Sequence, residues 1–323
     1  MQFEENFFEK EIRCGFEVPS LMKRAWAAEM EVLAVVVDIC NNNGLRYFAD
    51  SGTLLGAIRH QGFVPWDDDI DITMLRKEYD QLIQILPAQL PKGFVIQGIH
   101  SNDSIGRNDE GYSQLIVGAD QALWNPGEYM KYFHGYPFPS VGIDIFPLDG
   151  IPVDTEEYEI QRSLYDVGFA IVSSWDELKE EGKLEYRIKQ FEEVSGVSIP
   201  DTNAKCHIAR ITDKIAALYS IDECAELDCF MWHYKNPLKK EWYEQTKTVK
   251  FENMTIEVPI GYDDVLKTFY GDYKTIKKFT SKHEYPFYKD MEKDMEKMFC
   301  KRNYNFSLEE FCNKVMSGEI KVQ

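Results

Sequence analysis

The sequence of 323 residues is long enough for one large domain with insertions or for two modest domains. Hydrophobic residues make up 44% of it and aromatic residues 14%, so the chain can build a substantial core and is not globally disordered. Its formal charge of −19 excludes a protein that binds duplex nucleic acid over its whole surface, because neutralising phosphates requires clustered Lys and Arg.

Cysteine usage and hydropathy bear on where the protein works. The seven cysteines are irregularly spaced and contain no CxxC pair, which argues against a disulfide framework and a zinc ribbon. The first ten residues lack the layout of a signal peptide, and no apolar stretch reaches the roughly 18 residues that span a bilayer. We therefore expect a cytoplasmic protein without a transmembrane segment, for which peripheral membrane contact stays open.

The N-terminal part alternates helices with short strands. Apolar residues at helical spacing predict a helix over 19–43, with Ser20 as its candidate cap and Asn42-Asn43-Gly44 at its end. Alternation of acids or hydroxyls with Ile and Met predicts a strand over 69–74. The other elements expected here are a strand over 46–49, a short helix over 54–60 and an amphipathic helix over 76–86 closed by Pro87.

Proline and glycine in residues 147–152 mark a change of composition. The elements expected around it are strands over 94–99, 112–117 and 141–146, helices over 155–172, 175–194 and 204–234, a hairpin over 246–258 and a helix over 262–269. No repeat or linker divides the chain, so a single elaborated α+β domain is predicted. Its parts are an N-terminal helical segment (1–45), a catalytic core (46–151), a helical insertion on the acceptor side (152–240) and a hairpin with C-terminal helices (241–323) that complete the same domain.

The segment Pro65-Trp66-Asp67-Asp68-Asp69-Ile70-Asp71-Ile72 is the strongest chemical signal. Side chains alternate between the faces of a strand, so Asp69 and Asp71 share one face, Asp67 extends it if the strand reaches back, and Asp68 faces away. Neighbouring carboxylates repel unless a cation lies between them, and Mg²⁺ (or Mn²⁺) favours oxygen ligands. The alternatives are a solvated acidic loop and, more weakly, an EF-hand, which would need a Gly and a Glu that are missing here.

Two further features point to the same chemistry. Asp144 is the one acid in the apolar strand 141–146, and a buried acid is costly unless it is paired or binds a metal; a structural Asp near Pro147 is the alternative. The turn Ser51-Gly52-Thr53 precedes a short helix, where glycine permits close approach and free amides favour phosphate oxygens. Arg59 and His60 would bring cationic donors to a phosphate; ordinary capping and helix-end charges are the alternatives for these residues.

These segments together resemble the LicD family, which includes the catalytic domain of fukutin-related proteins. The resemblance rests on residues 47–72, on Ile143-Asp144-Ile145-Phe146-Pro147-Leu148-Asp149-Gly150, and on Val258-Pro259 and Tyr270-Gly271-Asp272-Tyr273, with His283 following. It implies a nucleotidyltransferase-like mixed sheet with flanking helices and a helical insertion. It also implies that Asp69 and Asp71 bind the metal and that Asp144 is the third carboxylate.

The resemblance further implies transfer of a phosphoryl-alcohol group, commonly phosphocholine, from a CDP-alcohol donor to a hydroxyl of a cell-surface glycan, a lipid-linked glycan or a teichoic acid precursor. Fukutin-related members move ribitol phosphate and carry membrane anchors and a zinc element that this sequence does not show, which favours the bacterial, cytoplasmic side of the family. Asp144, or the acid left free of metal, would accept the proton of the acceptor hydroxyl.

Aromatic side chains would recognise a quaternary ammonium group, and Trp66 and the run Tyr129 to Phe138, with Tyr132, are the candidates. His283 and the segment 270–273 would close the site, with a glycine-capped helix end as the alternative for the latter. Three rival functions stay open: a nucleotidyltransferase that moves NMP to a small acceptor, an inactive binding protein, and a DxD glycosyltransferase. The alcohol, the acceptor and the oligomeric state are not predicted.

Overall fold

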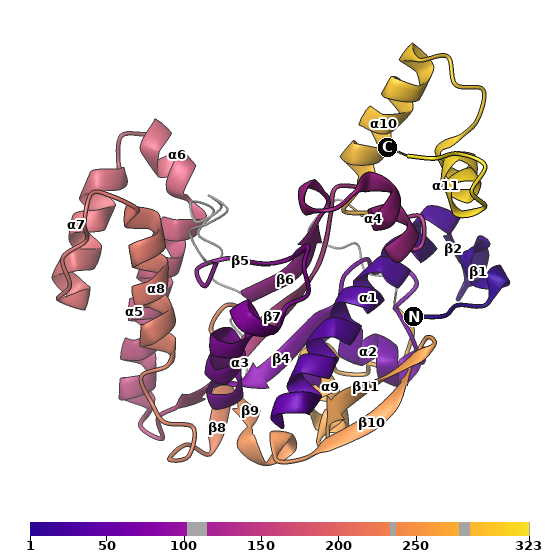
Figure 1. Ribbon diagram of the computed structural model, residues 1–323. Coiled ribbons are helices and arrows are strands. Elements are labelled where there is room, and N and C mark those ends of the chain that lie inside the picture. The colour runs from indigo at the N-terminus through magenta and orange to yellow at the C-terminus, as the bar shows by residue number, and fades with distance from the viewer. Residues whose placement is uncertain (102–114, 233–236, 278–284, 323) are drawn as a thin grey trace.

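A mixed β-sheet forms the centre of the protein in the computed structural model, which describes residues 1–101, 115–232, 237–277 and 285–322 (Figure 1). Its main path runs β3-β4-β7-β6-β5; β4 and β7 are parallel, and the other neighbours are antiparallel. The strands of this sheet are β3 (Phe48–Ala49), β4 (Asp71–Leu75), β5 (Phe94–Gln97), β6 (Leu115–Asp120), β7 (Ser140–Ile151), β8 (Glu226–Asp228) and β9 (Leu238–Lys239). The predicted α+β class with a mixed sheet is confirmed.

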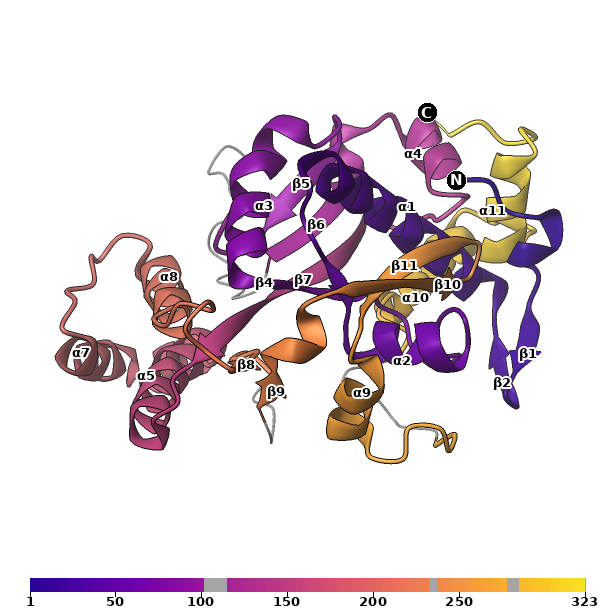
Figure 2. The same ribbon diagram turned by 90° about the horizontal axis from the view of Figure 1, so that it is seen from below.

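Helices cover both faces of this sheet. α1 (Ser20–Asn43) and α3 (Arg76–Gln89) pack on one face, and Figure 2 shows α2 (Ser51–Arg59) and α9 (Tyr262–Tyr270) on the opposite side. The hairpin of β10 (Thr246–Phe251) and β11 (Met254–Pro259) runs beside β3 and α2. Side chains of β4 and β7 such as Ile72 and Ile145 are completely buried between these layers, which fixes the two strands rigidly.

A helical arm extends from the end of β7 (Figure 1). It contains α5 (Thr155–Ser173), α6 (Trp175–Glu180), α7 (Leu184–Ser195) and α8 (Ala204–Ala216), which bury a separate apolar cluster around Tyr165 and Phe191. At its junction with the sheet, Arg76 donates two hydrogen bonds to Asp149 (2.6 and 2.9 Å) and one to Asp213 of α8 (3.0 Å). The arm is therefore tied to the core by the ion pair of Arg76 with Asp213 as well as by the chain.

The opposite end of the molecule gathers segments from both ends of the sequence (Figure 1). These are η1 (Glu5–Phe8), β1 (Glu11–Arg13), β2 (Phe16–Val18), α10 (Lys289–Lys301) and α11 (Leu308–Met316), which meet α4 (Pro126–Tyr132) from the middle of the chain. The remaining 3-10 helices among the described residues are η4 (Gln121–Leu123) and η5 (Lys240–Tyr243). The β1–β2 hairpin is not predicted from the sequence. Its turn uses Cys14 and Gly15 with φ of 50° and 69°, in place of the Asn-Gly or Asp-Gly pair that signals such turns.

Several predicted boundaries differ from the observed ones. Pro87 lies inside α3 and does not close it, and Ser20 is the first residue of α1, with Pro19 at the N-cap position. The helix expected over 175–194 is broken at Gly182, whose φ of 67° is left-handed. The helix expected from Ala204 ends at Ala216, because the chain then returns to the sheet as β8. Among the helices described, none is long and apolar enough to cross a membrane.

Candidate active site

The two acidic strands singled out in the sequence are neighbours in the sheet. Asp71 of β4 is the register partner of Asp144 of β7, although the two residues are 73 positions apart along the chain. The backbone N–H of Asp144 donates to the carbonyl of Ile70 (3.1 Å), which fixes the register at this point. The fold therefore brings together the two acids that sequence reasoning placed in one site, and their chemical roles stay predictions.

The acids at positions 67–69 lie in a loop. β4 begins at Asp71, so the alternation of faces expected from Asp67 onward does not apply to the residues before it. Asp67, Asp68 and Asp69 each offer a carboxylate oxygen, and these oxygens lie within 4.8 Å of one another. The expectation that Asp68 faces away is therefore wrong: it belongs to the cluster and also accepts a hydrogen bond from the N–H of Phe287 (2.6 Å).

Burial and mutual repulsion dominate the electrostatics of this cluster. Burial and then the charge of Asp69 raise the pKa of Asp67 and of Asp71 well above the usual range of a carboxyl group. Burial and then the charge of Asp69 also raise the pKa of Glu29, whose side chain reaches the site from α1. A hard divalent cation such as Mg²⁺ or Mn²⁺ would relieve this repulsion, and the oxygen donors present suit it.

A cavity of about 410 Å³ lies beside the cluster. Asp68, Asp69 and Asp144 line it together with Glu29, whose side chain is 2% exposed and whose Oε2 accepts no hydrogen bond from the described residues. Sequence reasoning missed Glu29, although a signal exists. It follows Trp26 by three positions and precedes Leu33 by four, so an acid interrupts the apolar stripe of the helix.

The strand-to-helix turn at Ser51-Gly52-Thr53 supports the acids directly. A Cβ atom on Gly52 would lie 2.0 Å from Oδ2 of Asp67, so glycine is what lets that carboxylate approach the helix. Thr53 is buried, and its hydroxyl oxygen accepts a hydrogen bond from the N–H of Asp71 (2.9 Å). Ser51 has a left-handed φ of 45° and makes no capping bond; Asp50 holds the N-cap position. This turn thus positions the acids, and its contact with phosphate stays a prediction.

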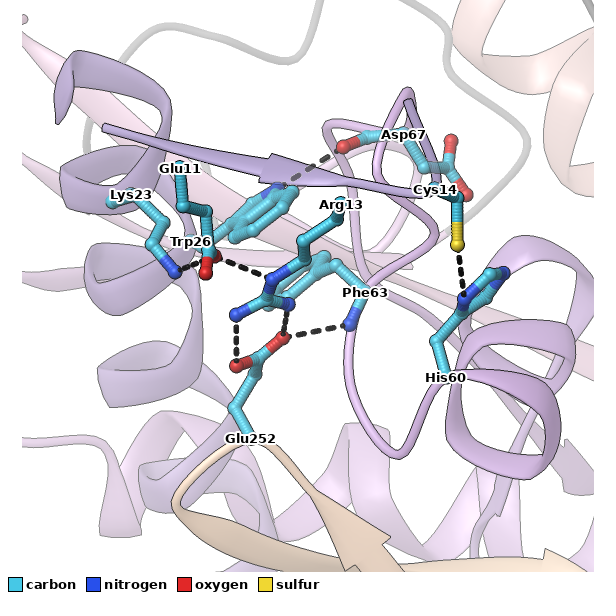
Figure 3. Close-up of polar contacts among 9 residues, drawn as sticks. All are labelled: Glu11, Arg13, Cys14, Lys23, Trp26, His60, Phe63, Asp67 and Glu252. Carbon is cyan, nitrogen blue, oxygen red and sulfur yellow. Dashed lines mark hydrogen bonds and ion pairs between the residues drawn. The ribbon is translucent and has the colours of Figure 1, made fainter. Parts of the chain in front are cut away.

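Arg59 and His60 form a chain of hydrogen bonds at the end of α2. Nη1 of Arg59 donates to the carbonyl of Tyr273 (2.9 Å), and its Nε donates to Nε2 of His60 (2.9 Å). Nδ1 of His60 lies 3.8 Å from Sγ of Cys14, as Figure 3 shows. Burial and then the charge of Arg59 lower the pKa of His60 to about 4, so His60 is neutral near pH 7. Both side chains thus already have protein partners.

The aromatic residues predicted to recognise a quaternary ammonium group do not line the acidic cavity. Most of the run Tyr129 to Phe138 packs in the core, where Tyr129, Phe133, Tyr136 and Phe138 are buried. Tyr132 is 37% exposed and packs on Trp124, and it does not line the acidic cavity. Trp66 packs edge-on to Phe16 and His60. Among the described residues, Phe287 is the aromatic residue that lines the cavity, and the predicted contact His283 lies outside them.

A network around Arg13 holds the acidic loop from behind (Figure 3). Its guanidinium forms an ion pair with Glu252, whose Oε1 accepts the N–H of Phe63 (3.1 Å), and it lies 5.3 Å from the ring centroid of Trp26. Trp26 stacks on Phe63 and donates from Nε1 to the carbonyl of Asp67 (3.0 Å). The two hairpins β1–β2 and β10–β11 therefore fix the backbone from which Asp67 projects.

Acids on two parallel strands, next to a glycine turn that opens a helix, are the architecture of a nucleotidyltransferase-like domain. Residues 44–152 match the family model described as LicD/FKTN/FKRP, nucleotidyltransferase domain. The chain thus carries a LicD-family domain, and the predicted resemblance is confirmed.

Curated relatives support this assignment. A lipopolysaccharide cholinephosphotransferase LicD of Haemophilus influenzae is 24% identical over 243 residues, which cover 73% of this chain and 84% of the relative. An uncharacterized protein of Rickettsia prowazekii is 42% identical over 59 residues, 18% of this chain and 22% of its own. The ribitol 5-phosphate transferase FKRP of Homo sapiens is 34% identical over 59 residues, 18% of this chain and 12% of its own. This chain therefore spans most of the first relative and under a quarter of the other two.

Proposed function

We propose that this protein transfers a phosphoryl-alcohol group, phosphocholine, from a CDP-alcohol donor to a hydroxyl group of a cell-surface glycan or teichoic acid precursor. The observation that carries the proposal is the register of Asp71 with Asp144 beside the acidic loop, within a LicD-family domain. The 24% identity to a cholinephosphotransferase over most of both chains supports the choice of phosphocholine.

Asp69 and Asp71, with Asp67 as a further ligand, would hold Mg²⁺ (or Mn²⁺) in this function. The bound ion would supply neutralisation of the donor pyrophosphate and polarisation of a phosphoryl oxygen. Burial and then the charge of Asp69 raise the pKa of Asp67 and of Asp71, which favours a site completed by a cation. The acids are held rigidly by β4, by Thr53 and by the network around Arg13, which suits a reaction that depends on positioning.

The transfer itself breaks one phosphorus–oxygen bond and forms another. The acceptor hydroxyl oxygen bonds to the phosphorus that carries the alcohol, and the electron pair of the broken bond leaves on an oxygen of CMP. Asp144, or the acid left free of metal, takes the hydroxyl proton. The turn at 51–53 and Arg59 would contact the donor phosphates, which for Arg59 requires exchange of its present bond to Tyr273.

The test uses CDP-choline labelled separately in its choline and in its cytidine. With Mg²⁺ and an acceptor glycan, the choline label should reach the product and the cytidine label should leave as CMP. Transfer of the cytidine label would favour the rival nucleotidyltransferase. An acceptor-free thermal-shift screen of CDP-alcohols provides a second measurement, because a ligand present at about 100 times its Kd stabilises a fold by about 2.7 kcal/mol. The proposal would be contradicted if no CDP-alcohol stabilised the fold and none served as a donor for transfer.

A further inference from the structure

Glu29 is a buried acid that lines the acidic cavity. It lies in the most deeply buried part of α1, beside Ala28 and Met30, and its Oε2 has no hydrogen-bond partner among the described residues. The nearby charges that act most strongly on it come from Asp67, Asp68, Asp69 and Asp71. A carboxylate buried in this way is costly unless it takes up a proton or a cation compensates its charge.

The basic residues of the same helix are engaged elsewhere. Lys23 forms an ion pair with Glu11, and Arg24 donates to Asn313 (2.5 Å) and to the carbonyl of His134. Glu31, two positions beyond Glu29, accepts from His134 (2.7 Å) and pairs with the N-terminal amino group. His134 and the N-terminal amino group therefore compensate the charge of Glu31, whereas Glu29 lines the cavity.

The walls of the cavity indicate which kind of cation would fit. No Lys, Arg or His is among the described residues that line it, and beside its acids it is lined by Gln97, Gly142, Ile116, Val141 and Phe287. Its volume of about 410 Å³ lies within the range of small-molecule sites. A hydrated metal ion gains little from an apolar wall, whereas an alkylammonium group gains from carboxylates, methyl contacts and an aromatic face together.

We propose that Glu29 is a specificity-determining residue, which with Asp68 and Phe287 binds the cationic head group of the alcohol and selects it over a neutral polyol. The backbone N–H of Phe287 donates to Asp68 (2.6 Å), so the anion is held beside the residue that carries the aromatic ring. Asp69 and Asp144 lie in the same cavity, which places the head group next to the acids assigned to the chemistry. The inference rests on the proposed transferase function, since that function supplies the alcohol.

The test compares wild type, Glu29→Gln and the control Glu31→Gln with CDP-choline and with the neutral donor CDP-ribitol. Glu29→Gln should lower kcat/KM for CDP-choline at least about tenfold, mainly through KM, because loss of one partner of a buried charge pair usually costs more than one decade of affinity. It should leave CDP-ribitol within about twofold. Glu31→Gln should change neither value, and calorimetry with phosphocholine and ribitol 5-phosphate should show the same pattern without turnover.

The outcomes separate this inference from the proposed function. Wild type that neither binds nor uses any CDP-alcohol overturns both. Wild type that uses CDP-choline, with its preference unchanged in Glu29→Gln, overturns the role of Glu29 alone, as does loss of one bound Mg²⁺ in that variant. If Glu29→Gln fails to fold, Phe287→Leu decides: Phe287 is 39% exposed, so the fold should tolerate the change, and an unaltered donor preference would overturn the proposal.

Discussion

Buried carboxylates occur in two regions of this protein, and their partners differ. At the junction of sheet and helical arm, Asp149 and Asp213 both accept from Arg76, and Asp228 accepts from Arg162 (3.3 Å) and Tyr158 (2.8 Å). Around the acidic loop, Glu29 and Asp71 are 2% and 6% exposed, yet the charges that act most strongly on them are those of other acids.

The contrast shows how a structural acid can be told from a functional one. Both regions take carboxylates out of water, which is unfavourable, and the junction offsets this with guanidinium groups, that of Arg76 in bidentate geometry with Asp149. Burial alone therefore does not mark a site. A group of buried acids that lacks protein cations is a better indication that a ligand or a metal completes it.

The largest effect is expected from Asp69→Asn, which tests whether the cavity acids act in the chemistry. Transfer should fall by about 10²–10³-fold or more, because the variant loses a charge that positions and stabilises the reacting phosphoryl group. The fold should persist, since one member of a repelling group has been removed. Initial rates with CDP-choline and a thermal melt measure the two effects, and a rate close to that of wild type would remove Asp69 from the mechanism.

Arg76→Ala tests the other region. It should lower the free energy of unfolding by about 3–5 kcal/mol, because Asp149 would stay buried without its cation and Asp213 would lose the same partner. Arg46→Ala is the matched control: the pair of Arg46 with Glu78 is partly exposed and should contribute less than about 1 kcal/mol. Denaturant unfolding measures both, and equal losses in the two variants would mean that the junction is not specially stabilised.

Gly52→Ala sharpens the assignment of Asp67. The added methyl group would collide with the carboxylate of Asp67, which can rotate away, so stability should change little while the carboxylate leaves its place. We expect weaker Mg²⁺ binding and about a tenfold or greater loss of transfer, on the scale of a displaced ligand partner. Calorimetric titration with Mg²⁺ measures the first effect; unchanged Mg²⁺ affinity would show that Asp67 is not a ligand.

The smallest effect concerns His60. Burial and the nearby positive charges of Arg59 and Arg13 disfavour its protonated form, whereas the charges around Glu29 and Asp71 are negative. The pKa of His60 is lowered to about 4, so the unfolded chain takes up a proton first as the pH falls. The stability due to neutral His60 is therefore complete above about pH 6.5 and is lost as the pH falls toward 4. His60→Gln should flatten the melting temperature over this interval, and an unchanged slope would contradict the prediction.

The sequence predicted the parts of the site that depend on local patterns. The alternation in residues 69–74 and the single acid in the apolar strand around Asp144 both indicated strands, of which the first begins at Asp71, and the parallel register joins them. The prediction that Asp68 faces away from the other acids was wrong, because side chains alternate between faces only in a strand, and Asp68 lies in the loop that ends at Ile70. Glu29 was missed because a helical pattern identifies a buried face and not what the chain places opposite it.

Long-range contacts account for most of the remaining differences. The β1–β2 hairpin lacks a standard turn sequence, and its role depends on the contact of Arg13 with Glu252, which no local pattern encodes. Trp66 and Tyr132 were both reasonable aromatic candidates, and only packing shows that neither lines the cavity while Phe287 does. Local rules thus located the strands, and tertiary contacts decided which side chains share the cavity.

The ion pair of Arg13 with Glu252 also bears on the order in which the protein assembles. The two residues are 239 positions apart. During synthesis, the loop that carries Asp67 therefore cannot gain the contact between Arg13 and Glu252 until most of the chain has been made. Until then β4 and β7 can pair, but the backbone at Asp67 lacks its final brace. Competence for the reaction would then appear only near the end of synthesis, so that an incomplete product would hold the acids without being able to use them.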